Sequence, residues 1–131
     1  MEHMSEILVV DDSRVMRDMI VACLRADGGL EFTQAASGLE AIEQLSLKHF
    51  DLLVLDLNMP DIGGIEVTQF VRSQPAGKEL PIVIVTTRGD ETSRARALEA
   101  GASRYVTKPF TPDEILGEVR SLLAPNRERP Q

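Results

Sequence analysis

A short apolar run that ends on one acidic residue constrains the fold of this chain most strongly. The run is Leu52–Leu55, and it is followed at once by Asp56. Pro60 and the pair Gly63–Gly64 then indicate a loop. A continuous apolar segment bounded by turn residues is typical of a strand buried on both faces, as in parallel sheets. Such a strand would present the Asp56 carboxylate at the carboxyl edge of the sheet, where open α/β folds place their ligand sites.

Strands and helices are predicted to alternate along the whole chain, five of each. The expected strands are 7–10, 32–36, 52–55, 82–85 and 104–107, and the second of them is expected at an edge. In the first helix, i, i+3, i+4 spacing predicts one apolar face, formed by Met16, Met19, Ile20, Cys23 and Leu24. The second helix is expected to turn Leu39, Ile42 and Leu45 inward, and the polar fourth helix to rely on Ala95 and Leu98.

Capping residues mark the helix ends. Ser37 with Glu40, and Thr111 with Glu114, form capping-box patterns at the starts of the second and fifth helices. Asp90 is a predicted N-cap, and a glycine follows the same helix at position 101.

Strict alternation of strands and helices implies an α/β fold, a doubly wound five-stranded parallel sheet with helices on both faces. At 131 residues the chain fits a single domain. We expect that domain over residues 1–131, with a core of about 6–124 and tails at 1–5 and 125–131.

Composition narrows the functional classes. The net charge of −7 argues against direct nucleic-acid binding and against binding to anionic membranes. The sequence has no apolar run long enough to cross a bilayer and no signal-peptide pattern. Its single cysteine, Cys23, excludes an internal disulfide and fits a reducing compartment, so we expect a cytoplasmic protein in which Cys23 packs in the core.

Polar side chains that could bind an ion or take part in a reaction follow four of the five predicted strands. They are Asp11 and Asp12, Asp56, Thr86, and Lys108. In a parallel sheet these positions meet at one edge. Carboxylates gathered there would repel one another unless a cation lay between them. Oxygen ligands without a nearby His or Cys favour Mg²⁺, with Mn²⁺ as a substitute, over zinc. A metal, a hydroxyl and an ammonium group together predict a phosphoryl-transfer site with Asp56 as the nucleophile.

These residues make the chain resemble a response-regulator receiver domain of bacterial two-component systems, of the chemotaxis-regulator-like type, over roughly residues 6–124. The resemblance is carried by four segments taken together: Val9–Ser13, Leu55–Pro60, Val85–Thr86 and Tyr105–Phe110. It implies a flavodoxin-like fold with strand order 2-1-3-4-5. It also implies a signalling domain rather than an enzyme, with intrinsic self-phosphorylation and self-dephosphorylation.

The resemblance assigns roles within this site. Asp56 would accept a phosphoryl group from a sensor histidine kinase or a phosphotransfer protein. Asp12, Asp56 and the backbone carbonyl of Asn58 would bind Mg²⁺ directly, and Asp11 would help through water. Lys108 would pair with the phosphoryl group.

Further roles concern switching. The resemblance implies that Thr86 moves towards the phosphoryl group, that Tyr105 follows from exposed to buried, and that Asn58 and Arg88 tune the phosphate lifetime. It also implies a cis bond before Pro109. Affinity for a downstream partner, or for an output domain on a longer protein, would change through the face running from the fourth strand to the fifth helix. The protein would be a monomer or a phosphorylation-dependent dimer.

Two other functions are weighed against this one. An Mg²⁺-dependent phosphatase of the haloacid-dehalogenase type needs a second aspartate two positions after the nucleophile, and this chain has Asn58 there. A flavodoxin-like nucleotide or flavin module needs a phosphate loop after the first strand, where Asp11 and Asp12 would repel a phosphate.

One residue departs from the receiver pattern. Receivers commonly carry an aspartate where this chain has Gly63, and that aspartate would help to cap the next helix. The departure leaves the stiffness of the loop after Asp56 open, but not the chemistry. His49 has no partner at metal-ligand spacing. The arginines at 88, 94, 96 and 104 fit either a partner-binding face or a solvated face.

Overall fold

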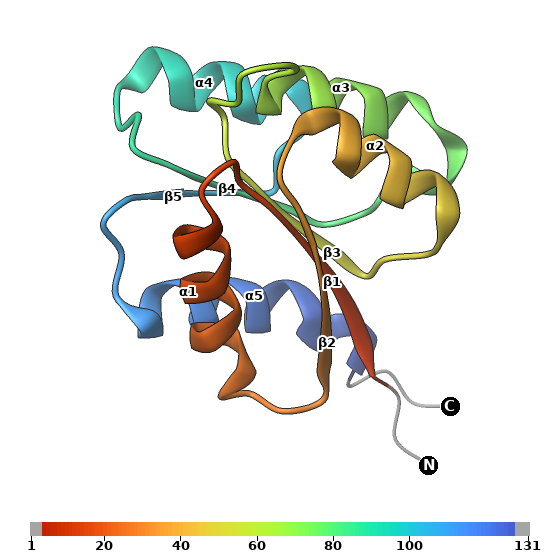
Figure 1. Ribbon diagram of the computed structural model, residues 1–131, viewed down its shortest axis with the longest axis vertical. Coiled ribbons are helices and arrows are strands. Elements are labelled where there is room, and N and C mark those ends of the chain that lie inside the picture. Colours follow the sequence, from red (N-terminus) through yellow and green to blue (C-terminus); the bar gives the residue numbers. More distant parts are fainter. Residues whose placement is uncertain (1–3, 128–131) are drawn as a thin grey trace.

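The computed structural model describes residues 4–127, and for residues 124–127 it describes only the helical backbone. Five parallel strands form one sheet in the order β2-β1-β3-β4-β5 (Figure 1). The strands are β1 (Ser5–Val10), β2 (Leu30–Ala35), β3 (Leu52–Leu55), β4 (Ile82–Thr86) and β5 (Arg104–Thr107). The predicted sheet and strand order are therefore confirmed.

Helices cover both faces of this sheet. They are α1 (Arg14–Arg25), α2 (Gly38–Leu47), α3 (Gly64–Ser73), α4 (Glu91–Ala100) and α5 (Pro112–Arg127), with a short 3₁₀ helix, η1 (Pro75–Gly77), after α3. Figure 1 shows α1 and α5 on one side of the sheet and α2, α3 and α4 on the other. None of the helices in the described part of the chain is long and apolar enough to span a membrane.

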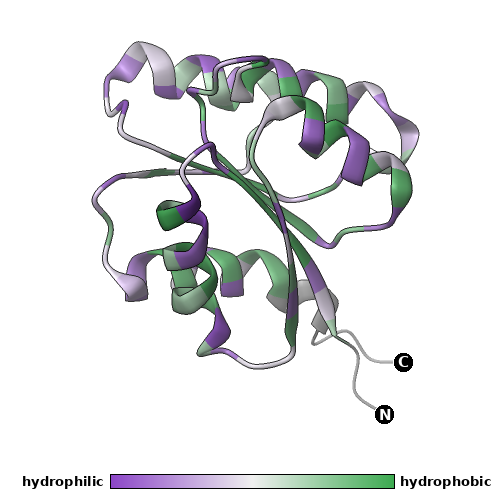
Figure 2. Cartoon of the chain, viewed as in Figure 1, coloured by the Kyte–Doolittle hydropathy of each residue, from purple (hydrophilic) through white to green (hydrophobic). Residues whose placement is uncertain are grey.

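The strands supply the centre of two apolar cores, one on each face of the sheet. In Figure 2 the central strands are the most continuously hydrophobic segments, whereas the helices carry polar residues outward. Alternate side chains of β3 illustrate the division, since Leu52 packs with α1 and α5 and Leu53 packs with α2, α3 and α4. All four β3 side chains are buried, as the apolar run predicts for a central parallel strand.

The predicted helix caps are present. The Ser37 hydroxyl accepts a hydrogen bond from the Glu40 N–H at 3.1 Å. Thr111 and Glu114 exchange reciprocal bonds, and the Asp90 carboxylate accepts from the Ser93 N–H at 2.9 Å. Gly101 ends α4 in the left-handed conformation, with φ of 119°.

Several predicted core positions are instead exposed. Met19, Leu39 and Leu98 expose 47%, 59% and 41% of their surface, and Ala95 is exposed as well. Val21, Ala41 and Ala97 take the buried positions on the same three helices. The spacing of apolar residues predicts which face of a helix points inward. How many residues on that face are buried depends on the neighbouring elements.

The two ends of the domain also differ from expectation. Strand β1 begins at Ser5 rather than Ile7, because Ser5 pairs with Leu30 and its N–H donates to the Gly29 carbonyl at 2.9 Å. Helix α5 runs to Arg127, so Pro125 lies inside it. The hydrogen bond that a proline removes does not end the helix here. The remainder of the two predicted tails, 1–3 and 128–131, lies outside the described residues.

Helix α4 is shallowly packed, since seven of its ten residues are exposed. Its buried residues are Ser93 and Ala97, neither of them large. At its carboxyl end, the Arg72 guanidinium of α3 donates to the Gly101 carbonyl oxygen at 2.8 and 3.1 Å. The helix is therefore held at one end by a polar contact rather than along its length by apolar burial.

Gly64 allows the loop after β3 to approach the start of α3. A Cβ atom at this position would lie 2.4 Å from the Asp56 carbonyl oxygen and 2.9 Å from the Leu57 Cα atom. Both contacts are with backbone, so neither can be relieved by turning a side chain.

We therefore expect Gly64→Ala to lower the free energy of unfolding by about 2 kcal/mol, as overpacking does in a tight site. Gly117→Ala, on an exposed position of α5 with nothing within 4 Å, is the matched control. It should raise stability by about 0.5–1 kcal/mol. Urea unfolding followed by circular dichroism measures both changes, and a neutral Gly64→Ala would contradict the close approach.

Candidate active site

Three carboxylates meet at the carboxyl edge of the sheet. Asp11 and Asp12 follow β1, Asp56 follows β3, and one oxygen from each lies within 4.8 Å of the others. The sheet register explains the meeting, because Val10 and Leu55 are partners and the Asp56 N–H donates to the Val10 carbonyl at 3.1 Å. The predicted gathering of acidic side chains is thus present.

The three carboxylates differ in their surroundings. Asp11 and Asp56 expose only 2% and 7% of their surface, whereas Asp12 is exposed. One Asp11 oxygen accepts a hydrogen bond from the Ser13 N–H at 2.9 Å, which fixes the orientation of the carboxylate. Ser13 also caps α1, accepting from the Met16 N–H at 3.2 Å, so the first helix itself holds the loop that carries the two aspartates.

Lys108 compensates part of the negative charge. Its Nζ donates to Asp11 Oδ2 at 2.8 Å and lies 3.9 Å from Asp56 Oδ1, and its side chain is 12% exposed. The peptide bond from Lys108 to Pro109 is cis, as the sequence resemblance implies. The Lys108 N–H donates to the Thr86 carbonyl at 2.8 Å, which ties the end of β5 to the end of β4.

The pKa of Asp56 is raised above its ordinary value. Burial is the largest cause, and the nearby Asp11 charge adds to it. Lys108 and hydrogen bonds from the Asn58 backbone and the Thr86 hydroxyl oppose the shift without cancelling it. Removing a carboxylate from water disfavours its charged form, so a further cation beside Asp56 would be accommodated favourably.

Thr86 and Tyr105, the predicted switch pair, are joined through one residue. Thr86 is fully buried, and its hydroxyl oxygen accepts from the Arg88 N–H at 3.3 Å. The Tyr105 hydroxyl donates to the Arg88 carbonyl oxygen, and the Tyr105 ring lies 5.7 Å from the Arg94 guanidinium. A displacement of Thr86 would therefore reach Tyr105 through the Arg88 backbone.

Asn58 and Arg88, the two predicted tuning positions, line one cavity of about 180 Å³. The other lining residues are Leu57, Ile65, Glu66, Ser93 and Arg96. Sequence reasoning did not place Glu66 or Arg96 here. Both lie on helices whose rotation towards this edge is set by tertiary packing, and no motif marks them.

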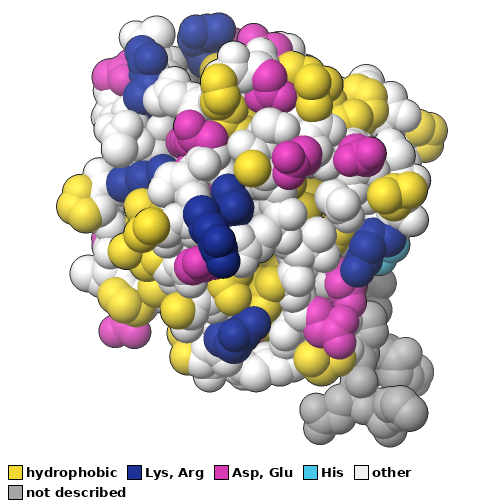
Figure 3. All heavy atoms as spheres, viewed as in Figure 1, with side chains coloured by type: hydrophobic (Ala, Val, Ile, Leu, Met, Phe, Trp, Pro, Cys, Tyr) yellow, Lys and Arg dark blue, Asp and Glu magenta, His cyan; other side chains and the backbone are white. Residues whose placement is uncertain are grey.

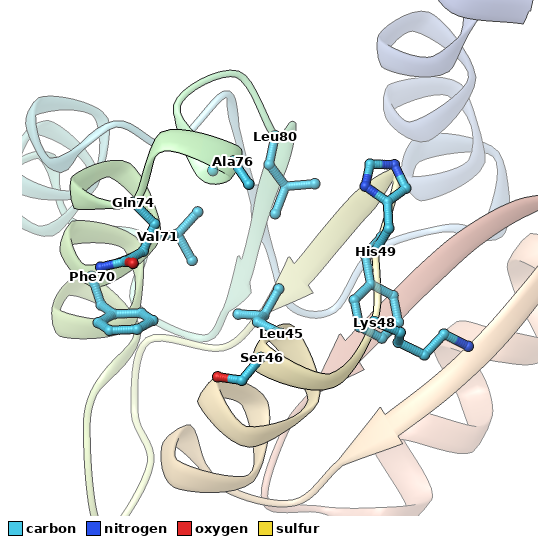
Figure 4. Close-up of a pocket in the computed structure, with 11 residues that line it drawn as sticks. Leu45, Ser46, Lys48, His49, Phe70, Val71, Gln74, Ala76 and Leu80 are labelled. Carbon is cyan, nitrogen blue, oxygen red and sulfur yellow. The ribbon is translucent and has the colours of Figure 1, made fainter.

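A second cavity, of about 200 Å³, lies at the opposite edge of the sheet, near the amino ends of β3 and β4 (Figure 4). Leu45, Val71 and Leu80 line it, with His49 at its edge. No carboxylate of the described residues lines it, so the acidic cluster rather than cavity size identifies the candidate site. His49 Nε2 lies 3.3 Å from Asp51 Oδ1 and joins no group that could hold a metal among the described residues.

The donor set fits a magnesium ion. Three carboxylates supply hard oxygen ligands within reach of one another, and the exposed Asp12 leaves the cluster open to water on one side. Charged side chains of both signs are otherwise interspersed over the face shown in Figure 3. Among the described residues, the buried charged ones are Asp11 and Asp56, so the concentration of buried negative charge is a local feature of this edge.

Comparisons with known proteins agree with this geometry. The model of the response regulator receiver domain family matches residues 7–120. The chain is 37% identical over 122 residues to the chemotaxis protein CheY1 of Helicobacter pylori, covering 92% of this chain and 98% of that protein. It is 40% identical over 117 residues to the response regulator MprA of Mycobacterium ulcerans, covering 89% of this chain but only 49% of MprA. The chain thus spans nearly all of one relative and about half of the other.

Solved structures give the same result. A putative response regulator from Chloroflexus aurantiacus superposes with a TM-score of 0.87 at 37% identity, covering 92% of this chain and 98% of that one. The receiver domain of the sensor histidine kinase PA1611 from Pseudomonas aeruginosa, solved with a magnesium ion coordinated in its active-site cleft, superposes with a TM-score of 0.84 at 29% identity, covering 92% and 98%. With the fold, the acidic cluster and the family match in agreement, this chain belongs to the response regulator receiver domain family.

Proposed function

We propose that this domain is a phosphorylation-dependent switch in which Asp56 accepts a phosphoryl group from the phosphohistidine of a sensor kinase or phosphotransfer protein. The observation that supports this most directly is the cluster of Asp11, Asp12 and Asp56, with the Lys108 ammonium group in reach of two of them. A carboxylate nucleophile between a cation site and a lysine is the arrangement that phosphoryl transfer requires.

In the proposed reaction an Asp56 carboxylate oxygen forms a bond to phosphorus while the bond from phosphorus to the donor histidine nitrogen breaks. The electron pair of that bond stays with the imidazole. Asp12, Asp56 and the Asn58 carbonyl would hold Mg²⁺ or Mn²⁺, with Asp11 acting through water. The bound cation would neutralise charge on the phosphoryl oxygens. Lys108 Nζ, which already lies between Asp11 and Asp56, would donate to one of those oxygens.

Asp56 must be ionised to attack. Burial in the metal-free fold favours its protonated form, and only Lys108 and two hydrogen bonds favour the charged form. A bound divalent cation would also favour the charged form of Asp56. When bound, the cation would therefore favour the ionised form of Asp56 and also neutralise charge on the transferring group. The same site would support self-phosphorylation from a small phosphodonor and later hydrolysis of the acyl phosphate.

The switch would pass through Thr86 to α4. The phosphoryl group brings new acceptor oxygens, which draw the Thr86 hydroxyl and Lys108 towards Asp56. The Arg88 backbone, bonded to both Thr86 and Tyr105, would then move with the start of α4. Because α4 buries only two small residues, it would be easily repositioned within the face from β4 to α5. A protein partner, or an output domain in a longer protein, would bind to that face in the cytoplasm.

The competing functions receive no support from the site. Asn58 stands where an aspartyl phosphatase needs a second acid, and its amide cannot donate a proton as a general acid. The loop after β1 carries two carboxylates, which would repel the phosphate of a flavin or nucleotide.

Acetyl phosphate with Mg²⁺ should label Asp56. We expect Asp56→Asn to lose essentially all of the label, since it lacks the nucleophile, whereas Asp113→Asn, on the exposed first turn of α5, should label like wild type. Intact-protein mass spectrometry measures the added phosphoryl group. Labelling of Asp56→Asn at the wild-type level would refute the assignment.

Asp56 should also set a pH dependence of stability. The folded state raises the pKa of this carboxyl, so its ionised form destabilises the metal-free fold at pH values above the folded pKa. That effect disappears below the unfolded pKa of about 3.9. Asp56→Asn should therefore be more stable than wild type at pH 7, by a margin that shrinks towards pH 4. Urea unfolding in EDTA across this range measures the margin, and a constant margin would contradict the raised pKa.

Mg²⁺ should narrow that margin at pH 7. At about ten times its Kd, a ligand that binds only the folded state adds about 1.4 kcal/mol to stability. Wild type should gain this amount, and Asp56→Asn, which lacks one anionic ligand, should gain much less. Equal gains in urea unfolding experiments with Mg²⁺ would show that the ion does not bind at Asp56.

A further inference from the structure

The loop after Asp56 is fastened to a helix far from it in the sequence. Asp61 Oδ1 accepts a hydrogen bond from the Gly38 N–H at 3.1 Å, and Asp61 Oδ2 accepts from the Leu39 N–H at 2.9 Å. These are the first N–H groups of α2, which have no partner within the helix. The hydrogen bonds lower the pKa of Asp61, so its carboxylate is charged at neutral pH and suits the positive end of the helix.

Packing brings the same two segments together. A Cβ atom on Gly38 would lie 2.5 Å from the Ile62 carbonyl oxygen and 2.8 Å from the Ile62 Cβ. Ile62 itself packs against the apolar core beneath α2, α3 and α4. The segment that carries Asn58 therefore meets the start of α2 both through Ile62 and through the Asp61 carboxylate.

The other end of this loop lacks such support. Gly63 is the N-cap of α3 and provides no side-chain hydrogen bond to it. Gly63 is the position at which the sequence departs from the receiver pattern, and this departure does not say how stiff the loop is. The carboxylate of this loop instead stands two residues earlier, at Asp61, and accepts hydrogen bonds from a different helix, α2.

We propose that Asp61 is a positioning residue for the metal site. By clamping the loop to α2, it would hold the Asn58 carbonyl in the place where a cation bound by Asp12 and Asp56 could use it. This inference rests on the proposed function, because it assumes that Asn58 contributes to a Mg²⁺ site.

Calorimetric titration with Mg²⁺ tests the inference without relying on activity. Asp61→Ala should weaken Mg²⁺ binding by about tenfold, the lower end of what loss of a supporting group outside the ligand shell costs. The initial rate of labelling by acetyl phosphate should fall at low Mg²⁺ and return to the wild-type rate at saturating Mg²⁺. This split between affinity and maximal rate is not expected from general destabilisation.

Ser37→Ala is the matched control. It removes the other side-chain cap of α2, the bond from the Glu40 N–H to the Ser37 hydroxyl, and leaves the loop contact in place. We expect Ser37→Ala to lower the free energy of unfolding as Asp61→Ala does, while Mg²⁺ affinity stays within about twofold of wild type. If Ser37→Ala weakens Mg²⁺ binding as much as Asp61→Ala, the effect belongs to α2 stability and the inference is overturned.

A second variant restores the lost stiffness from the other end. Asp61→Ala combined with Gly63→Asp would place a carboxylate at the N-cap of α3. A Cβ atom at position 63 would lie 2.7 Å from Glu66 Oε1, the end of a flexible exposed side chain, and 3.2 Å from the Leu57 carbonyl oxygen. The first contact can move aside. Recovery of Mg²⁺ affinity in this double variant would support positioning as the role of Asp61.

The outcomes separate the two proposals. If wild type binds no Mg²⁺, the proposed function and this inference fail together. If wild type binds Mg²⁺ and Asp61→Ala binds it equally well, the metal site stands and only the role of Asp61 is refuted.

Discussion

The placement of like charges beside one another at the edge of the sheet is the constraint on which the rest of the structure depends. Asp11 and Asp56 are both nearly excluded from water, and each raises the electrostatic cost of the other. Lys108 offsets part of that cost from a strand three positions away in the sheet from β1. The parallel topology makes this possible, because it brings the ends of β1, β3 and β5 to the same edge. A fold that gathers charge in this way loses some stability, and it holds together the carboxylates that the proposed cation site and phosphoryl transfer require.

Much of this could be predicted from the sequence, because the relevant signals are local. The apolar run of β3 ending on Asp56, the capping boxes and the βα alternation are each set by residues close together in the chain. Once the alternation implies a parallel sheet, the meeting of Asp11, Asp56 and Lys108 follows from topology alone. The cis bond before Pro109 came from the family resemblance, and no feature of composition or spacing would have indicated it.

The features that the sequence did not predict share a physical cause. Met19 and Leu39 lie on helices whose apolar face was predicted correctly. Whether a residue at the margin of that face is buried depends on the neighbouring helix. In α4 too few apolar residues are present to define a side, so Ala97 rather than Ala95 packs inward. Asp61 was missed because its partners are more than twenty residues away and its own neighbours look like an ordinary loop. Contacts between loops and distant helix ends leave no periodic trace in a sequence.

The small buried surface of α4 affects how the sequence of such a domain can change. Since Ser93 and Ala97 are its buried residues, substitutions at its outward positions remove little core packing. The outer surface of this helix can therefore acquire new partner preferences without a matching loss of folding free energy. The acidic cluster has no such latitude, because Asp11 and Asp56 are buried beside each other and Lys108 offsets only part of their charge. The molecule thus joins an acidic edge, where few substitutions are tolerated, to the adjoining outer surface of α4, where many are.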